Sequence, residues 1–117
     1  MRGTVKFFDK NKGWGYITGM DGEDYFVHCS YIQTKGFRTL TAGDIVSFTP
    51  ESTERGKKAA EVIPELTYAM VSRKAEKKGL HLENVQSPVI WRIVDENHVI
   101  QAGEKGMHLP EVDKYLS

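Results

Sequence analysis

Alternating side chains in two short segments, residues 12–17 and 25–28, most restrict how this chain can fold. Each segment reads as a β-strand, in which successive side chains point to opposite faces of the sheet. The stretch Gly19–Gly22 between them is rich in turn formers, so the two strands are expected to pair as antiparallel neighbours. The pairing places four ring side chains together on one face: Trp14, Tyr16, Phe26 and His28.

Strand-like segments continue through the first 64 residues. They are short and separated by turn formers, with no long helical period: Gly3–Phe8, Gly15–Thr18, Tyr25–His28, Asp44–Thr49 and Ala59–Ile63. This pattern predicts a mainly β fold, a small closed barrel of five strands. Apolar residues on the face opposite the rings are expected to fill its interior: Val5, Ile17, Val27, Ile45 or Val46, and Val62.

Lysines accompany the rings, at Lys6, Lys10 and Lys12. Rings beside lysines suit a single nucleic-acid strand, because bases stack on rings and ammonium groups neutralise phosphates. The alternative is that the rings belong to the barrel core, but both ring and aliphatic sets together would overfill a small interior. The formal net charge is zero, so any affinity for nucleic acid must come from local clustering of charge.

Residues 1–64 resemble the bacterial cold-shock domain, an OB-type barrel that binds single-stranded nucleic acid. Four motifs in the family's order carry the resemblance: GTVKFFD at 3–9, KGWGYI at 12–17, DYFVH at 24–28 and GFRTL at 36–40. RNA-recognition-motif domains carry a string similar to the second motif. In those domains, however, the shorter motif comes first and helices intervene. The resemblance covers none of residues 65–117.

The resemblance implies which side chains meet nucleic acid. The family's base-stacking positions fall on six rings: Phe7, Trp14, Tyr16, Phe26, His28 and Phe37. A seventh falls on Cys29, so the site is expected to be about one base shorter or weaker than the family's. Phosphate contacts are expected from Lys6, Lys12 and Arg38, with Lys57 and Lys58 as further candidates. Strict alternation would put Phe7 inside the barrel, so its implied role requires a β-bulge in the first strand.

Residues 65–117 change in character and read as a small α+β extension. The expected elements are a helix at Glu65–Lys78, a strand at Leu80–Val85, a hairpin of Val89–Val94 and Val99–Ala102, and a short helix at Leu109–Leu116. The first helix shows a narrow apolar stripe on Leu66, Ala69, Met70 and Arg73. A chain of roughly 50 residues forms a small core, so this part is expected to dock on another surface.

The role of this extension stays open at the level of sequence. Its Met70, Ile90, Trp91 and Ile93 are expected to form a satellite core, or alternatively a patch for a protein partner or a homodimer. Trp91 and Arg92 are candidates to extend the nucleic-acid track. Acidic and basic residues nearly balance over 65–117, which argues against a broad phosphate-binding face.

Catalytic and metal chemistry find little support in the sequence. His28 adjoins Cys29, but adjacent strand residues face opposite ways and are not expected to share a metal or a proton. The other histidines lack recognised ligand spacing, and no cofactor is implied. A single cysteine suits a reducing cytoplasm, and no apolar run approaches the roughly 20 residues of a membrane helix.

The sequence therefore predicts a non-enzymatic, cytoplasmic binder of single-stranded RNA or DNA. What the resemblance implies is action as an RNA chaperone or as a modulator of transcription or translation. The alternative hypothesis is an adaptor whose C-terminal part mediates protein contact or self-association, with nucleic-acid binding secondary.

Overall fold

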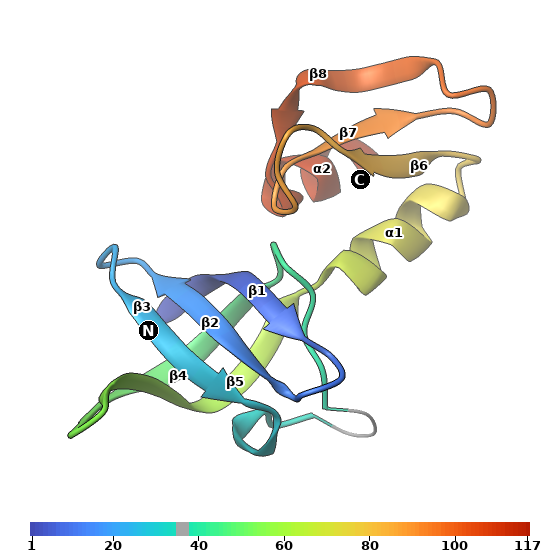
Figure 1. The fold of residues 1–117 in the computed structure, drawn as a ribbon. Coiled ribbons are helices and arrows are strands. Elements are labelled where there is room, and N and C mark those ends of the chain that lie inside the picture. The colour runs from blue at the N-terminus through green and yellow to red at the C-terminus, as the bar shows by residue number, and fades with distance from the viewer. Residues whose placement is uncertain (35–37) are drawn as a thin grey trace.

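The chain folds into a five-stranded β-barrel followed by a three-stranded sheet with two helices (Figure 1). This architecture comes from a computed structural model, which describes residues 1–34 and 38–117. The barrel strands are β1 (Arg2–Asp9), β2 (Trp14–Gly19), β3 (Asp24–His28), β4 (Ile45–Thr53) and β5 (Gly56–Leu66). They close in the order β1-β2-β3-β5-β4. The predicted OB-type barrel with a small α+β part after it is confirmed.

The barrel interior is filled by the aliphatic residues that alternate with the rings. Val5, Ile17, Val27, Val46 and Val62 are all fully buried, as predicted, and of the two alternatives it is Val46 that turns inward. Further residues complete the core without having been predicted: Tyr25, Ile32, Leu40, Phe48 and Ala59. This interior leaves the rings of Trp14, Tyr16, Phe26 and His28 on the outer face of the barrel wall, while Tyr25 on β3 points inward.

The first strand contains the predicted β-bulge. Val5 pairs with Ile17 and Phe7 pairs with Tyr16, so Lys6 is the extra residue in β1. An extra residue reverses the alternation beyond it. Val5 is therefore buried, whereas Phe7 is 41% exposed on the outer face.

The C-terminal module, residues 67–117, is built on one antiparallel sheet. Its elements are α1 (Tyr68–Glu76), β6 (His81–Asn84), β7 (Trp91–Val94), β8 (Ile100–Met107) and α2 (Leu109–Leu116), with β7 between β6 and β8. Trp91 and Ile93 share one face of β7 and are buried with residues of both helices. Both helices therefore cover that face and complete a second core, separate from that of the barrel.

The first helix starts later than the sequence predicts. β5 continues through Leu66, which pairs with Ile45, and the helix begins at Tyr68, where the Thr67 side chain accepts a hydrogen bond from the Met70 N–H. The helix consequently buries Val71 and Ala75 instead of the predicted stripe. Met70 is 52% exposed, so its prediction as a core residue is wrong. Long-range strand pairing has overridden local helix propensity here.

The last elements of the module follow the prediction with one extension. β8 reaches Met107 instead of ending at Ala102, and its two glycines, Gly103 and Gly106, have φ values of 75° and 101°. The final helix lies at Leu109–Leu116 with a proline in its first turn, as predicted. No helix within the described ranges is long and apolar enough to cross a membrane.

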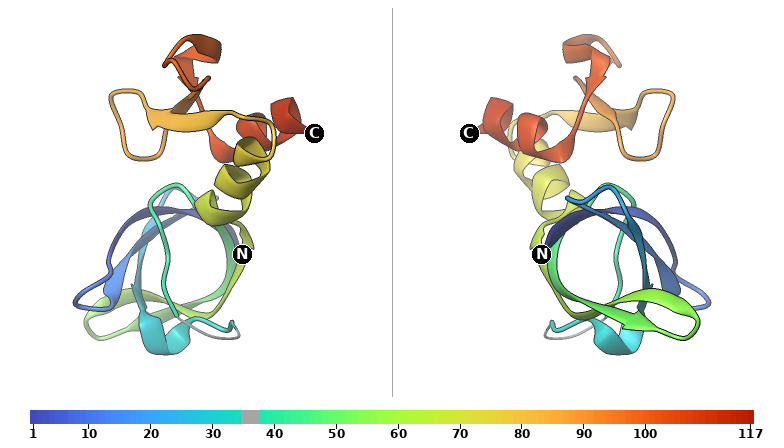
Figure 2. Two further views of the ribbon diagram at one scale, coloured as in Figure 1. Left: turned by 90° about the vertical axis from the view of Figure 1, so that its right-hand side faces the viewer. Right: turned by 90° about the vertical axis from the view of Figure 1, so that its left-hand side faces the viewer.

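The module stands to one side of the barrel and meets it at the loop before β4 (Figure 2). The Trp91 ring lies against Gly43, whose φ is 93° and where a Cβ atom would overlap the indole. The buried carboxylate of Asp44 accepts hydrogen bonds from the backbone N–H groups of Thr41 (2.9 Å) and Tyr68 (2.8 Å). Burial raises the pKa of Asp44, and these hydrogen bonds only partly oppose the shift. Asp44 thus ties the first residue of α1 to the barrel loop.

Candidate nucleic-acid interface

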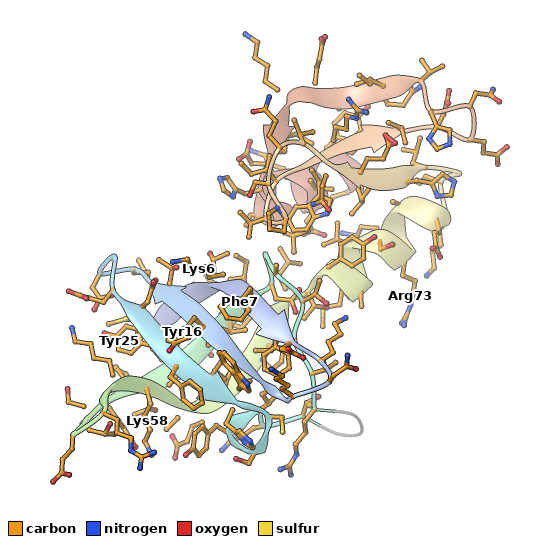
Figure 3. The ribbon with its side chains drawn as sticks, viewed as in Figure 1. Lys6, Phe7, Tyr16, Tyr25, Lys58 and Arg73 are labelled. Carbon is orange, nitrogen blue, oxygen red and sulfur yellow. The ribbon has the colours of Figure 1, made fainter. Side chains whose placement is uncertain are left out.

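Rings from three neighbouring strands share the outer face of the barrel. We call this surface the aromatic platform; it consists of Phe7 on β1, Trp14 and Tyr16 on β2, and Phe26 and His28 on β3. Strand register brings them together, because Tyr16 lies between Phe7 and Phe26 while Trp14 lies opposite His28. Figure 3 shows Phe7 nearer the module than Tyr16. The five predicted stacking residues in the described part of the chain therefore lie side by side.

The rings of the platform contact one another by edges and tilted faces. Ring centroids lie 5.7 Å apart for Phe7 and Trp14, 5.9 Å for Tyr16 and Phe26, and 6.1 Å for Trp14 and Phe26. Mixed edge and tilted contacts hold the rings at fixed angles. Phe7 is exposed and the other four are half-buried. Each ring is supported from below and beside while part of its surface remains open to solvent.

Gly15 allows the platform to sit on a bulged strand. The bulge brings the β1 backbone so close that a Cβ atom at Gly15 would overlap the Phe7 carbonyl oxygen and lie 2.7 Å from the Phe8 Cα. Only glycine can therefore separate Trp14 from Tyr16 at this point in β2. Close packing of β1 against β2 therefore explains why glycine stands at position 15 of the motif.

The imidazole of His28 is held by the short 3-10 helix η1 (Cys29–Tyr31), for which it serves as the N-cap. Its Nδ1 accepts a hydrogen bond from the Ser30 backbone N–H at 3.1 Å and lies 2.8 Å from the Ser30 Oγ. A backbone N–H can only donate, so Nδ1 carries no proton and the neutral ring carries its proton on Nε2. Capping thus sets both the orientation and the tautomer of the platform histidine.

Cys29 and His28 come closer than strand alternation predicts. The Cys29 Sγ lies 3.8 Å from the His28 Nδ1. The premise that the two side chains face opposite ways is wrong here, because β3 ends at His28 and the chain turns into η1. The lone pair of Nδ1 already accepts the Ser30 N–H, so the expectation that His28 and Cys29 do not readily share a metal or a proton stays a prediction. Cys29 also packs against the barrel core. Within residues 1–34 and 38–117, no three His, Cys, Asp or Glu side chains gather as metal ligands do.

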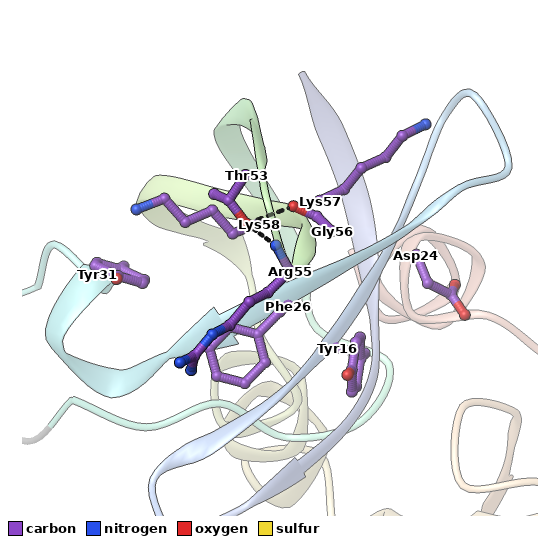
Figure 4. Close-up of a pocket in the computed structure, with 9 residues that line it drawn as sticks. All are labelled: Tyr16, Asp24, Phe26, Tyr31, Thr53, Arg55, Gly56, Lys57 and Lys58. Atoms are coloured by element: carbon purple, nitrogen blue, oxygen red, sulfur yellow. Dashed lines mark hydrogen bonds between the residues drawn. The ribbon is translucent and has the colours of Figure 1, made fainter.

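A groove of about 550 Å³ continues the platform toward the β4–β5 hairpin (Figure 4). Its lining combines rings with cations: Tyr16, Asp24, Phe26, Tyr31, Thr53, Arg55, Gly56, Lys57 and Lys58. The Lys58 ammonium lies 4.9 Å from the centroid of the Tyr31 ring and 3.4 Å from a Glu51 carboxylate oxygen. A hydrogen bond with Glu51 is the main reason that the pKa of Lys58 is raised. The groove offers a stacking surface next to positive charge.

Two groove residues, Tyr31 and Arg55, were not predicted from the sequence. Tyr31 is out of phase with Phe26 and His28 on β3, and η1 brings its ring to 6.1 Å from the His28 ring. Arg55 lies in the hairpin tip, which alone reads as a solvated loop. A usable signal was present in Lys57 and Lys58, which follow Arg55 and were already candidates for phosphate contact.

The predicted phosphate-binding cations differ in their partners. The Lys6 ammonium lies 2.9 Å from Asp24, which also accepts a hydrogen bond from the Thr18 hydroxyl. The hydrogen bond from Lys6 is the leading cause of a lowered pKa at Asp24. Lys12 is exposed and forms no ion pair within the described part of the chain. Arg38 is exposed as well, and Phe37 lies outside the described residues.

The two candidates for a longer track in the module are placed differently. Trp91 is 3% exposed and belongs to the module core, so its ring is not an open stacking surface and the prediction of such a role is wrong. The Arg92 guanidinium lies 3.2 Å from Glu83, which pairs also with His98. A protein partner or homodimer for residues 65–117 stays a prediction.

Comparison with known proteins identifies the barrel. Residues 1–65 match the family described as the 'Cold-shock' DNA-binding domain. The chain belongs to the cold-shock domain family. The predicted resemblance is thereby confirmed, and nucleic-acid binding in general follows from it. Members of this family bind nucleic acid and are not enzymes. The match ends with β5, so it includes the platform and leaves out the module.

Individual relatives agree with the family assignment. Cold shock protein 1 of Lactiplantibacillus plantarum is 57% identical over 63 residues, which are 54% of this chain and 96% of that protein. A cold shock-like protein of Thermotoga maritima is 48% identical over 62 residues, 53% of this chain and 94% of the relative. The major cold shock protein of Streptococcus pyogenes is 46% identical over 61 residues, 52% and 91% of the two chains. The similarity thus spans nearly the whole of each relative.

Proposed function

We propose that this protein binds single-stranded RNA or DNA on the aromatic platform and holds it unpaired, as a non-enzymatic RNA chaperone or modulator of transcription or translation. The observation that carries the proposal is the row of five partly open rings on adjacent strands. Base–aromatic stacking contributes about 1–3 kcal/mol per base and tolerates any base. Bases inside a duplex already stack on their neighbours, so the platform selects unpaired strands.

Phosphate contact supplies the second part of the binding energy. Lys12 has no competing carboxylate among the described residues, so it meets a phosphate without breaking an ion pair. Lys6 is bound to Asp24 in the free protein, and a phosphate must exchange with that carboxylate. The exchange lowers the net gain from Lys6, so Lys12 and Arg38 carry more of the salt dependence.

The proposed order of events begins with stacking on the exposed Phe7 and the half-buried rings beside it. The strand then continues into the groove, where Tyr31 offers a further ring and Arg55 a guanidinium. Each base that binds is unavailable for pairing, so hairpins in the target melt as the platform fills. Sequence preference stays modest because stacking energy depends little on base identity.

Fluorescence titration tests this function directly. Trp14 is the partly open tryptophan and Trp91 is buried, so oligothymidine bound to the platform quenches Trp14 emission. A duplex of the same length serves as the control and is expected to bind far more weakly. A hairpin RNA with a fluorophore and quencher at its ends should open as protein is added. Equal affinity for duplex and single strand, with no hairpin opening, would contradict the proposal.

A further inference from the structure

The junction between the barrel and the C-terminal module contains a second pocket. It has a volume of about 310 Å³, which is in the range of small-ligand sites. One wall comes from Thr41 and Ala42 of the barrel loop, and the other from the module residues Tyr68, Asn84 and Trp91. Tyr68 is half-buried and its ring stacks on Trp91 with an interplanar angle of 22°. The pocket therefore exists only where both parts of the chain meet.

We propose that this pocket binds one more unpaired nucleobase, next along the strand whose other bases lie on the aromatic platform. The inference rests on the proposed function and extends it to the module, which the family match leaves out. The occupant we infer is a base at one end of the bound segment, stacked against Tyr68.

Continuity with the platform supports a nucleic-acid occupant. The loop that forms the barrel wall of the pocket runs along β1, since Gly43 donates its N–H to the Val5 carbonyl and Val5 donates to the Asp44 carbonyl. Phe7 lies two residues further along the same strand and nearer the module than Tyr16 (Figure 3). A strand that leaves Phe7 across this edge of β1 comes next to the loop that forms the barrel wall of the pocket.

Charge and polarity agree with the same occupant. The Lys10 ammonium lies 3.2 Å from the Thr41 hydroxyl, so a cation stands at the rim where a linking phosphate would pass. The amide of Asn84 lines the opposite wall and donates a hydrogen bond to the Ile90 carbonyl at 3.2 Å. Its carbonyl oxygen remains a hydrogen-bond acceptor for a base edge. A ring face, an amide and a cation together suit a nucleobase with its phosphate.

A length series of oligothymidines tests the inference on the full chain. Lengths run from about 4 to about 12 nucleotides, the range of OB-fold site sizes, with bases added at either end in separate series. Two variants fill the pocket from opposite walls, Asn84→Trp and Ala42→Phe. Glu104→Trp, on the exposed face of β8, is the matched control for an added ring.

The native protein and the control are expected to gain about 5- to 150-fold in affinity when the oligonucleotide first reaches the pocket. Asn84→Trp and Ala42→Phe should both lack this stepwise gain in affinity. Both should keep native affinity for the shortest oligonucleotide that binds. An unchanged step in both filled variants overturns the inference, as does a native protein that shows no such step. If no length binds the native protein, the proposed function itself fails.

Photocrosslinking gives an independent readout. An oligonucleotide carrying 5-iodouracil at the end that produces the affinity step is expected to crosslink to Tyr68 in the native protein and not in Asn84→Trp. The same base placed centrally should crosslink to platform rings in both proteins. Terminal crosslinks confined to the platform would overturn the inference even if a length step is seen.

Discussion

A tryptophan lies on a strand in both parts of this molecule, and the two side chains have opposite surroundings. Trp14 on β2 is half-buried among rings on the outer wall of the barrel, while Trp91 on β7 is 3% exposed beneath two helices. The barrel interior is already filled by aliphatic residues together with Tyr25 and Phe48, so the platform rings stay outside. The module has no closed barrel to fill, and the Trp91 ring is part of the core between its sheet and its two helices. The role of a strand aromatic thus depends on which element covers its face.

Truncating Trp91 has the largest expected effect, and that effect is on the stability of the module and not on binding by the barrel. Trp91→Ala should lower the free energy of unfolding of the module by about 3–5 kcal/mol, because it empties a packed core. The barrel should keep its affinity for a short oligonucleotide. Chemical denaturation followed by circular dichroism measures the first effect and titration measures the second. A stable Trp91→Ala protein would show that the module core does not depend on this ring.

Alanine substitutions at two glycines separate the free-energy cost of a left-handed backbone from the cost of steric overlap between the barrel loop and Trp91. Gly43 and Gly22 have φ values of 93° and 80°, but a Cβ atom overlaps Trp91 at Gly43 and meets nothing within 4 Å at Gly22. Gly22→Ala should cost about 1–2 kcal/mol for the left-handed backbone alone. Gly43→Ala should cost about 2–5 kcal/mol, since overpacking adds to the strain. Equal losses of thermal stability would mean that Trp91 does not rest on Gly43.

Removing platform rings should weaken binding without unfolding the protein. Trp14→Ala, Tyr16→Ala, Phe26→Ala and His28→Ala should each reduce the binding free energy of a short oligothymidine by about 1–3 kcal/mol. Isothermal titration calorimetry measures the affinity, and Met20→Ala is a control because its side chain is 78% exposed in the turn after β2, outside the aromatic platform. Native affinity in several ring variants with an intact fold would remove the platform from the account.

Removing a phosphate-binding charge should have a smaller effect, seen in how strongly the affinity for nucleic acid depends on salt. Lys12→Ala should reduce the slope of log affinity against log salt by about 0.7, the value for one phosphate contact on a single strand. Lys105→Ala, on the exposed part of β8, should leave the slope unchanged. Affinities measured at several salt concentrations decide between these outcomes. An identical slope for all three proteins would exclude a phosphate contact at Lys12.

The smallest expected effect concerns the pH dependence of barrel stability. The Tyr25 hydroxyl donates a 2.6 Å hydrogen bond to Asp21, which lowers the pKa of Asp21 and raises the pKa of Tyr25 to about 12. The Asp21 contribution is present above its unfolded pKa of 3.8 and is lost as pH falls below that value. The Tyr25 contribution is present below pH 10 and is lost toward pH 12.

Tyr25→Phe removes the hydrogen bond while keeping the buried ring, so both contributions should vanish together. The variant should lose less stability than native protein on acidification below about pH 4 and on moving from about pH 10 to 12. Thermal unfolding across this range provides the measurement. A variant whose stability parallels that of the native protein at both extremes would show that the bond does not affect folding.

Sequence reasoning succeeded where a pattern has a local cause. Alternation identified the buried Val5, Ile17 and Val27. The bulge that the structure contains was expected because alternation conflicts with the role that the family resemblance implies for Phe7. The same pattern also grouped the platform rings of β2 and β3, because two paired strands leave little freedom of register. These features depend on neighbouring residues and on one sheet.

Features that depend on distant pairing were beyond the sequence. The helix was expected from Glu65, but β5 continues to Leu66 because Ile45, far away in the chain, pairs with it. Tyr31 reaches the platform only because the chain turns at η1. The contact of Trp91 with Gly43 joins two parts whose relative placement no local pattern specifies.

Intermolecular nuclear Overhauser effects test the central claim most directly. In a complex of the full chain with a short oligothymidine, thymine methyl and ring protons should show such effects to the side chains of Trp14, Tyr16 and Phe26. Contacts of this kind would place bases against the outer wall of the barrel. Base protons that approach only the outer face of β6–β8, with none near these three rings, would contradict the account.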